Sequence, residues 1–481
     1  MIRTKNSAVK FLERYVPTKE KKHPGELGLL RMRELITHLD NPQLRYPTIH
    51  VGGTSGKGST ATIIASILAT RFKVGLHTSP HLVKINERIT YYVSRITKTI
   101  SDKEFISLVN SIVPVVEKME KGRYGAPSYF EIVTAMAFLY FVKKKVDIAV
   151  IEVGMGGRFD ATNVINPVVA VITNVGLDHT EILGETVEEI AQNKAGIIKP
   201  GIRVVSGVRQ PSVVKIITSK CKEQKARLLL LGKDFHYRVR TIGETGSVFD
   251  YQGELTINNL QLRLLGKHQV ENATLAISTI EHITNNIKQK TDYIKQLTFN
   301  EEDVRRGLRD AYIQGRLEIV KRNPTVILDG AHNPDKMRAL VEAIRSIWEL
   351  NRVGPWKGPT LTKTRKVIAI AAIKEDKNAK EMLEILVPIC WKIILTQYKV
   401  KMDQGEIVSF PPEELKRIII AITGSSTPGE SFTATPGVSL SHTVHDALDR
   451  AVKSADGNGI ILVTGSLYLV GEIKKFTNNS N

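Results

Sequence analysis

The stretch Thr48-Ile-His-Val-Gly-Gly-Thr-Ser-Gly-Lys-Gly-Ser-Thr60 places a short β-branched run before a glycine-rich loop that carries one lysine. Residues 48–51 are typical of a buried strand, residues 52–58 of a tight loop and residues 59–70 of a helix. In such a loop the backbone N–H groups can point inward, the helix N-terminus adds partial positive charge, and Lys57 adds a full charge. The stretch therefore predicts a phosphate-binding loop.

This loop departs from the usual phosphate-loop pattern at two positions. The pattern has glycine at position 51 and a hydroxyl residue directly after the lysine, whereas this chain has Val51 and Gly58, and its first hydroxyl is Ser59. An ordinary glycine-rich turn between a strand and a helix is the alternative interpretation. The strand, the lysine and the helix together favour the phosphate-binding loop.

The residues that follow extend the stretch into a β-α-β unit. Residues 73–78 have the pattern of a second strand, which implies a parallel sheet. Residues 79–89 form a loop at the end of that strand, where open α/β sheets place their ligand-binding residues. We therefore expect a ligand site at this edge of the sheet.

Polar side chains follow two further predicted strands. Residues 146–153 are nearly all apolar until Glu152, as in strands whose acid fixes Mg²⁺ beside bound phosphates. His179 follows the strand predicted at 168–173, where it would come near Glu152. Each could instead be an ordinary solvated residue past the sheet. Lys194 ends a helix that begins with a capping box, so its simplest role is that of a cation at a helix C-terminus.

The composition is that of a soluble enzyme with more than one domain. The chain has 481 residues, 42% of them hydrophobic and 24% charged, and no apolar run long enough to span a bilayer. Its two cysteines are far apart, which supports neither a disulfide framework nor a cysteine-based zinc site. The first residues lack the apolar stretch of an export signal. We expect a cytoplasmic enzyme with no membrane partner.

The formal charge of +19 favours anionic partners, so nucleic acid has to be considered. The basic residues are spread along the chain, and the densest groups are not interleaved with stacking aromatic residues. A solvated basic surface therefore explains the charge better, and we expect no nucleic-acid partner.

A second α/β series begins near residue 313. Its strands are predicted at residues 325–328, 366–373, 391–396 and 459–464, with helices between them, and residues 201–265 before it are predicted to alternate short strands with turns. We therefore expect an α/β protein: an N-terminal phosphate-loop ATPase domain with a mostly parallel sheet, residues 1–312, and a smaller Rossmann-like domain, residues 313–481.

The ordered motifs of the chain resemble those of the folylpolyglutamate synthase and dihydrofolate synthase family, within the Mur-type amide ligases. The resemblance spans nearly the whole chain. The motifs are Leu27-Gly-Leu29, His50 to Thr60, Thr78-Ser-Pro80, Asn86-Glu-Arg88, Phe130-Glu131, Glu152-Val-Gly-Met-Gly-Gly-Arg158, Asp160-Ala-Thr-Asn163, Asp178-His179, Lys194-Ala-Gly-Ile-Ile-Lys-Pro200, Gly315-Arg316 and Asp329-Gly-Ala-His-Asn-Pro334.

The resemblance implies a role for each of several residues. The ATP site would consist of Gly53, Thr54, Ser55, Gly56, Lys57, Gly58, Ser59, Asn272, Arg316 and Asp329. Two Mg²⁺ ions would be held by Ser79, Glu152, His179 and Lys194, the last carbamylated by CO₂ so that it carries an anionic oxygen. The pterin and the incoming amino acid would be bound by Tyr129, Phe130, Glu131, Phe159, Asp160, Ala161, His332 and Ser466.

The resemblance also implies an activity, the ATP-dependent joining of L-glutamate to dihydropteroate or to the glutamate tail of a folate. The acceptor carboxylate would first become an acyl phosphate, and Lys57, Glu152, His179, Lys194 and His332 would be the catalytic residues. We expect a monomer. Two alternatives stay open: a Mur-type ligase acting on another carboxylate, and a nucleic-acid-stimulated phosphate-loop ATPase.

Overall fold

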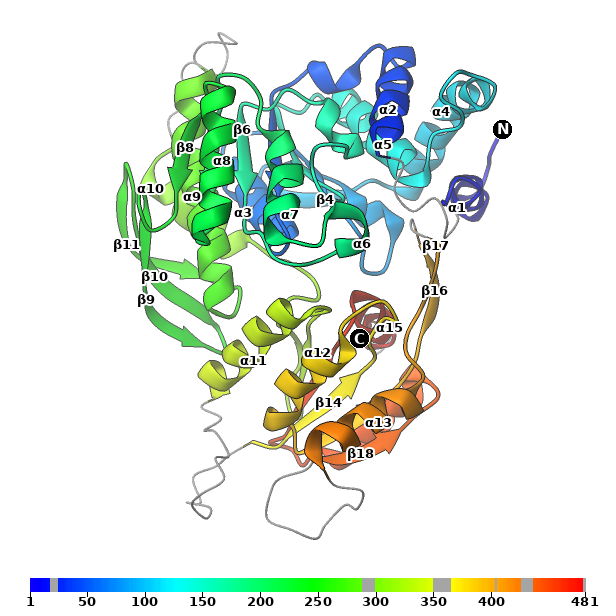
Figure 1. Cartoon of the computed structure of the whole chain (residues 1–481), viewed down its shortest axis with the longest axis vertical. Helices are drawn as coiled ribbons and strands as arrows, with labels where there is room; N and C mark the ends of the chain where they lie inside the picture. The colour runs from blue at the N-terminus through cyan, green and yellow to red at the C-terminus, as the bar shows by residue number, and fades with distance from the viewer. Residues whose placement is uncertain (18–24, 288–298, 349–364, 403–404, 425–435, 479–481) are drawn as a thin grey trace.

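The structure is a computed structural model that describes residues 1–17, 25–287, 299–348, 365–402, 405–424 and 436–478. Two lobes are visible in Figure 1. The first lobe, blue to green, contains the helices and strands up to residue 310, and the second lobe, yellow to red, contains those from residue 318 onward. Residues 351–364, whose glycine and proline content predicts a polar loop within the second α/β series, lie outside the described residues.

The first lobe is organised on an eight-stranded sheet with the strand order β4-β3-β2-β5-β1-β6-β7-β8. Six neighbouring strands are parallel, and the hairpin β3–β4 adds two antiparallel strands at one edge. The strands are β1 (Thr48–Gly52), β2 (Val74–His77), β3 (Ile89–Val93), β4 (Ile96–Thr99), β5 (Ile148–Glu152), β6 (Val169–Ile172), β7 (Arg203–Ser206) and β8 (Arg227–Leu230).

Helices cover both faces of this sheet because its central strands are apolar on both sides. In β5, for example, Ile148 and Val150 pack in the cluster that contains α3, whereas Ala149 and Ile151 pack in the cluster that contains α4 and α5. The helices are α1 (Lys5–Glu13), α2 (Glu26–His38), α3 (Lys57–Leu68), α4 (Asp102–Glu120), α5 (Tyr129–Lys144), α6 (Thr180–Leu183), α7 (Val187–Lys194) and α8 (Pro211–Glu223).

A smaller antiparallel sheet completes the first lobe and extends along the left edge of Figure 1 toward the second lobe. Its strands, in the order β11-β10-β9, pack with α9 and α10 on the face of the main sheet that α3 covers. These elements are β9 (His236–Gly243), β10 (Gly246–Gln252), β11 (Thr256–Leu262), α9 (Lys267–Ile287) and α10 (Glu301–Asp310).

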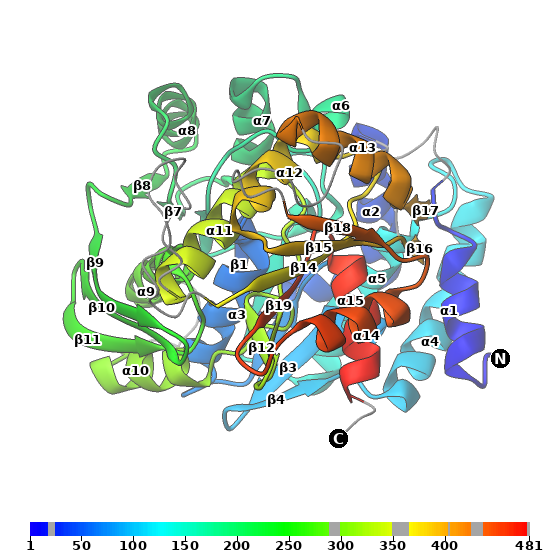
Figure 2. The same ribbon diagram turned by 90° about the horizontal axis from the view of Figure 1, so that it is seen from below.

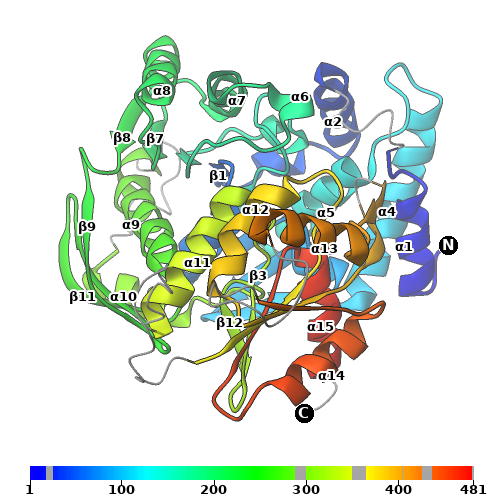
Figure 3. The ribbon, with the colours of Figure 1, turned by 60° about the horizontal axis from the view of Figure 1, so that its bottom comes forward.

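The second lobe is built on a six-stranded sheet with the order β12-β13-β19-β14-β15-β18, parallel except for β12. Figures 2 and 3 show α11, α12 and α13 on one face of it and α14 and α15 on the other. The strands are β12 (Glu318–Lys321), β13 (Thr325–Leu328), β14 (Val367–Ala371), β15 (Lys392–Leu395), β18 (Gly437–Leu440) and β19 (Ile460–Thr464), beside a separate hairpin of β16 (Lys399–Met402) and β17 (Gly405–Val408). The helices are α11 (Pro334–Trp348), α12 (Ala379–Leu386), α13 (Pro412–Thr423), α14 (Val444–Ser454) and α15 (Leu467–Asn478).

The predicted α/β class, the β-α-β unit and the four predicted strands of the second lobe are confirmed. The prediction of short strands and turns throughout residues 201–265 was wrong at α8. Its β-branched residues suggested strands, yet Val213, Ile217 and Cys221 recur every four residues and are the side chains that the helix buries. Within the described ranges, no helix has the length and apolar character needed to cross a membrane.

Candidate active site

Residues from both lobes line one cavity of about 600 Å³. It lies at the carboxyl ends of β1, β2, β5 and β6 and reaches the loops that follow β13 and β19. The predicted site residues that line it are Gly53, Thr54, Ser55, Gly56, Lys57, Gly58, Ser59, Ser79, Phe130, Glu131, Glu152, Phe159, Asp160, Ala161, His179, Lys194, Asn272, Arg316, Asp329, His332 and Ser466.

The glycine-rich loop leaves β1 and enters α3 at Gly56, which has a left-handed backbone with φ of 79°. A Cβ atom there would lie 2.4 Å from Asn272 Oδ1, so the close contact with α9 also requires glycine. Lys57, the first residue of α3, donates a hydrogen bond to Gly53 O at 3.1 Å. The lysine thus lies over the loop, at the end of the helix that carries partial positive charge.

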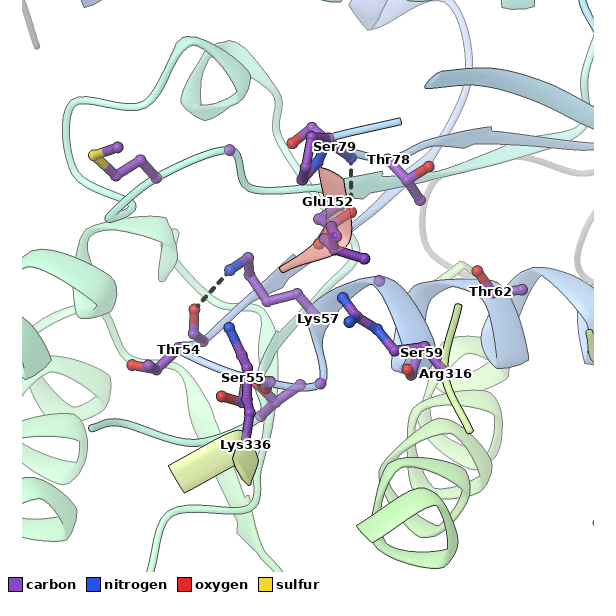
Figure 4. Close-up of a pocket in the computed structure, with 18 of the residues that line it drawn as sticks. Thr54, Ser55, Lys57, Ser59, Thr62, Thr78, Ser79, Glu152, Arg316 and Lys336 are labelled. Carbon is purple, nitrogen blue, oxygen red and sulfur yellow. Dashed lines mark hydrogen bonds between the residues drawn. The ribbon is translucent and has the colours of Figure 1, made fainter. Parts of the chain in front are cut away.

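The carboxylate of Glu152 lies against this loop and is 5% exposed. Its Oε2 accepts a hydrogen bond from Ser79 N at 2.9 Å, as Figure 4 shows, and a Cβ atom on Gly58 would lie 3.3 Å from it. The absence of a side chain after Lys57 therefore leaves room for the acid. Burial raises the pKa of Glu152, although the charges of Lys57 and Arg316 act in the opposite direction.

Lys194 approaches the same loop from the end of α7. Its Nζ donates to Gly53 O at 3.0 Å, so that two lysine side chains, Lys57 and Lys194, share one carbonyl oxygen. Burial, followed by the charge of Lys57, lowers the pKa of Lys194 to about 7. A substantial fraction of neutral amine is therefore expected near neutral pH.

His179 lies beside the carboxylate of Asp178 after β6. Burial lowers the pKa of His179 to about 4, although Asp178 acts to raise it, so its imidazole is neutral at pH 7. Burial alone would raise the pKa of Asp178, but the charges of Lys336 and Lys377 outweigh it and lower the pKa. Asp178 is therefore ionised.

The second lobe contributes Arg316 and Asp329. Both oxygens of Asp329 accept backbone hydrogen bonds, from Leu317 N at 2.9 Å and from Ala331 N at 2.8 Å. The acid thereby fixes the turn next to Arg316, which lines the same cavity as Ser59 at the start of α3. Burial raises the pKa of Asp329, while Arg316 acts to lower it.

Three lysines of the second lobe, Lys336, Lys374 and Lys377, line the cavity and were missed by the sequence analysis. Lys377 Nζ donates to Asp178 Oδ1 at 2.8 Å. Lys336 lies in the first turn of α11 and its Nζ is 2.8 Å from His332 Nε2. A cation in the first turn of a helix is unfavourable because it opposes the helix dipole. This unfavourable position is the sequence feature by which Lys336 could have been identified.

The residues proposed for the pterin pocket divide into three groups. Phe130, Phe159, Asp160 and Ala161 line the cavity. Glu131 also lines it, but Arg31 binds both of its oxygens, at 2.6 and 2.7 Å, and Glu131 Oε2 additionally caps α5. Tyr129 does not line the cavity.

Tyr129 requires a correction to the expected binding site. It is 4% exposed and packs in the hydrophobic core of the first lobe, beneath the guanidinium of Arg88 at 5.7 Å. As the first residue of α5, it points into the packing between helices and sheet, while the next residue, Phe130, points into the cavity. Direct contact of Tyr129 with a ligand is therefore not expected.

Comparisons with known proteins agree with this architecture. Residues 51–280 match the family model of the Mur ligase middle domain, and residues 313–476 match that of the dihydrofolate synthetase C-terminal domain. The dihydrofolate synthase/folylpolyglutamate synthase of Bacillus subtilis is 35% identical over 452 residues, covering 93% of this chain and 94% of that protein.

Two solved structures are similar over nearly their full length. The crystal structure of folylpolyglutamate synthase from Thermotoga maritima has a TM-score of 0.78 and 31% identity, covering 99% of this chain and 97% of that one. Mycobacterium tuberculosis folylpolyglutamate synthase complexed with ADP has a TM-score of 0.81 and 28% identity, with 98% and 99% covered.

The two lobes, the glycine-rich loop and the cavity between them define a ligase of the Mur type. Within that class, the chain belongs to the folylpolyglutamate synthase and dihydrofolate synthase family.

Proposed function

We propose that this chain is an ATP-dependent ligase that joins L-glutamate to dihydropteroate, to the glutamate tail of a reduced folate, or to both. The observation that supports it most is the convergence of Lys57, Glu152 and Arg316 on one cavity that also receives the strand ends of the second lobe. The structural neighbour complexed with ADP supports a nucleotide as the ligand of the loop. The proposal includes the division into domains at residues 1–312 and 313–481.

The chemistry follows from the low reactivity of a carboxylate toward an amine. Transfer of the γ-phosphoryl group to the acceptor carboxylate gives an acyl phosphate, and attack by the glutamate amine then expels phosphate. Lys57 and Arg316 would offset the charge that spreads over the phosphoryl oxygens. Because they belong to different lobes, closure around the nucleotide would complete the site and exclude water from the acyl phosphate.

We assign the nucleotide to the first-lobe loop and to the facing second-lobe residues. The residues that would bind it are Gly53, Thr54, Ser55, Gly56, Lys57, Gly58, Ser59, Asn272, Arg316 and Asp329. Phe130, Phe159, Asp160 and Ala161 would bind the pterin, and His332 and Ser466 the incoming amino acid.

The donor groups of the site fit Mg²⁺. Glu152 and Ser79 offer a carboxylate and a hydroxyl beside the loop, and His179 offers a neutral imidazole for a second ion. Among the described residues, no three His, Cys, Asp or Glu side chains come close enough to hold a metal by themselves. This suits Mg²⁺, which usually binds one or two carboxylates together with substrate phosphates and supplies a compact positive charge to their oxygens.

Carbamylation of Lys194 is part of the proposal, and it predicts a dependence on CO₂. A neutral amine is needed for addition of CO₂, and the pKa of Lys194 near 7 supplies one. Protein prepared without CO₂ should lose activity that bicarbonate restores, and ¹³C-bicarbonate should give a carbamate resonance by NMR. Lys194→Arg should abolish both the resonance and the restoration, whereas a resonance that persists in this variant would assign the carbamate to another lysine.

The test of the function is ADP release by the purified protein with Mg²⁺, ATP and glutamate, with dihydropteroate or tetrahydrofolate offered in separate reactions. Release that requires both glutamate and one acceptor supports the ligase and identifies the acceptor. The ligase function would be refuted if ATP hydrolysis rises with RNA or DNA and does not change when glutamate and either acceptor are added.

A further inference from the structure

Lys336 faces the glycine-rich loop from the opposite lobe. It is the third residue of α11, lines the cavity, and its side chain is 17% exposed. In Figure 4 its side chain extends toward the segment of Thr54 and Ser55, on the same side as Lys57. A second cation thus reaches the loop where phosphates are expected to lie.

The hydrogen-bond partner of Lys336 is a neutral group. His332 Nδ1 lies 2.8 Å from Gly330 O, so Nδ1 carries the proton and donates to that carbonyl. Nε2 is then left as the acceptor for the ammonium of Lys336 at 2.8 Å. Burial, and next the charge of Lys336, keep the pKa of His332 well below its usual value. The contact therefore orients Lys336 without neutralising it.

The nearby carboxylate of Asp178 is already occupied by other donors. Its Oδ1 accepts from Lys377 Nζ at 2.8 Å and from His179 N at 3.1 Å, and its Oδ2 accepts from Asn333 Nδ2 at 3.1 Å. Lys336 Nζ stays 3.8 Å away. Asp178 is thus hydrogen-bonded to Lys377 and forms a longer ion pair with Lys336, so that one carboxylate charge is shared between two lysines.

Other cations line the same cavity as Lys336. Burial is the largest cause that lowers the pKa of Lys336 to about 7, and the charges of Lys57 and Arg316 lower it further, although Asp178 raises it. Lys57, Arg316 and Lys336 are basic side chains from two lobes that line one cavity, and their mutual repulsion is unfavourable. A bound multivalent anion would offset this repulsion. The N-terminus of α11 adds partial positive charge of the same sign.

We propose that Lys336 is a further catalytic residue, whose ammonium contacts the phosphoryl group during its transfer from ATP to the acceptor carboxylate. An acceptor oxygen forms a bond to the γ-phosphorus as the bond from phosphorus to the bridging oxygen breaks, and the electron pair leaves on ADP. Lys57 contacts the transferring group from the loop and Lys336 from the second lobe. The assignment rests on the proposed function.

The experiment compares Lys336→Met with Lys380→Met, a control on α12 whose side chain is 74% exposed and away from the cavity lining. ADP and the non-hydrolysable ATP analogue AMPPCP are titrated into each protein with Mg²⁺ by calorimetry, and kcat is measured with saturating substrates. We expect Lys336→Met to bind AMPPCP at least about 10-fold more weakly, to bind ADP within about twofold of wild type, and to lose about 100-fold in kcat. The control should match wild type.

Equal weakening of ADP and AMPPCP would overturn the proposal, because it would indicate a structural role. Lys336→Met could instead raise the KM for glutamate and leave both kcat and the affinity for AMPPCP unchanged. This result would overturn the proposal, because it would indicate that Lys336 binds a carboxylate of glutamate. Lys336→Arg should recover part of the AMPPCP affinity, and it serves as the second variant if Lys336→Met folds poorly. Because the binding comparison does not need turnover, it tests Lys336 even if the wild type joins glutamate to neither acceptor.

Discussion

Lys57→Ala is expected to lower ADP release at least about 1,000-fold while leaving the protein folded. The ammonium of Lys57 lies over the glycine-rich loop, and its removal takes away a full charge from the place where the phosphoryl oxygens gain negative charge. Arg316 and Lys336 line the same cavity but approach it from the other lobe, so they do not replace the charge of Lys57 at the loop. The fall should therefore appear in kcat as well as in the affinity for ATP.

The matched control is Lys222→Ala, which removes an exposed lysine from α8. It should retain wild-type turnover, and both variants should melt close to the wild-type temperature because neither removes a core side chain. If the turnover of Lys57→Ala stays within tenfold of wild type, the loop does not have the phosphate-binding role that we assign to it.

Glu152→Gln has the second large expected effect, a loss of about 1,000-fold or more in turnover together with a higher Mg²⁺ requirement. The amide can still accept the hydrogen bond from Ser79 N, so the geometry of the loop is conserved. What disappears is the negative charge available to a divalent cation. Activity titrated against Mg²⁺ concentration measures the change, and an unchanged Mg²⁺ dependence would assign the ion to other groups.

The same substitution predicts a pH-dependent gain in stability. Burial raises the pKa of Glu152 above its ordinary value of 4.5, so the folded chain binds this proton more tightly than the unfolded chain. The stabilisation is fully present below the unfolded pKa and is lost as the pH rises through the folded pKa. Without Mg²⁺, Glu152→Gln should therefore melt at a higher temperature than wild type at pH 7.5, with a smaller difference at pH 5. A variant that melts below wild type at both values would contradict this account.

Much of the first lobe could be predicted because its signals are local. The strand, glycine loop and helix lie within one short stretch, and the capping box at Thr186 marks a helix start that the structure shows at α7. The run that ends in Glu152 likewise places its acid at the end of β5. Each of these patterns determines the backbone geometry of its own segment through residues that are close together in the sequence.

Other features depend on which face of an element is covered. The helix α8 was missed because Val213 and Ile217 belong to a β-branched run, although their spacing of four matches one helical face. Tyr129 and Phe130 are adjacent in sequence, and the position of α5 against the sheet sends one into the core and the other into the cavity. Composition alone does not distinguish such neighbours.

The sequence by itself determined a glycine loop with a lysine between a strand and a helix, in a parallel α/β lobe with an acid at a neighbouring strand end. Those properties need only contacts between residues near one another in the chain or on adjacent strands. The tertiary structure alone decided that Arg316, Lys336 and Lys377 of the second lobe line the same cavity as that loop. The physical reason is that their positions depend on how two separately folded sheets pack around one cavity, and no short-range pattern specifies that packing.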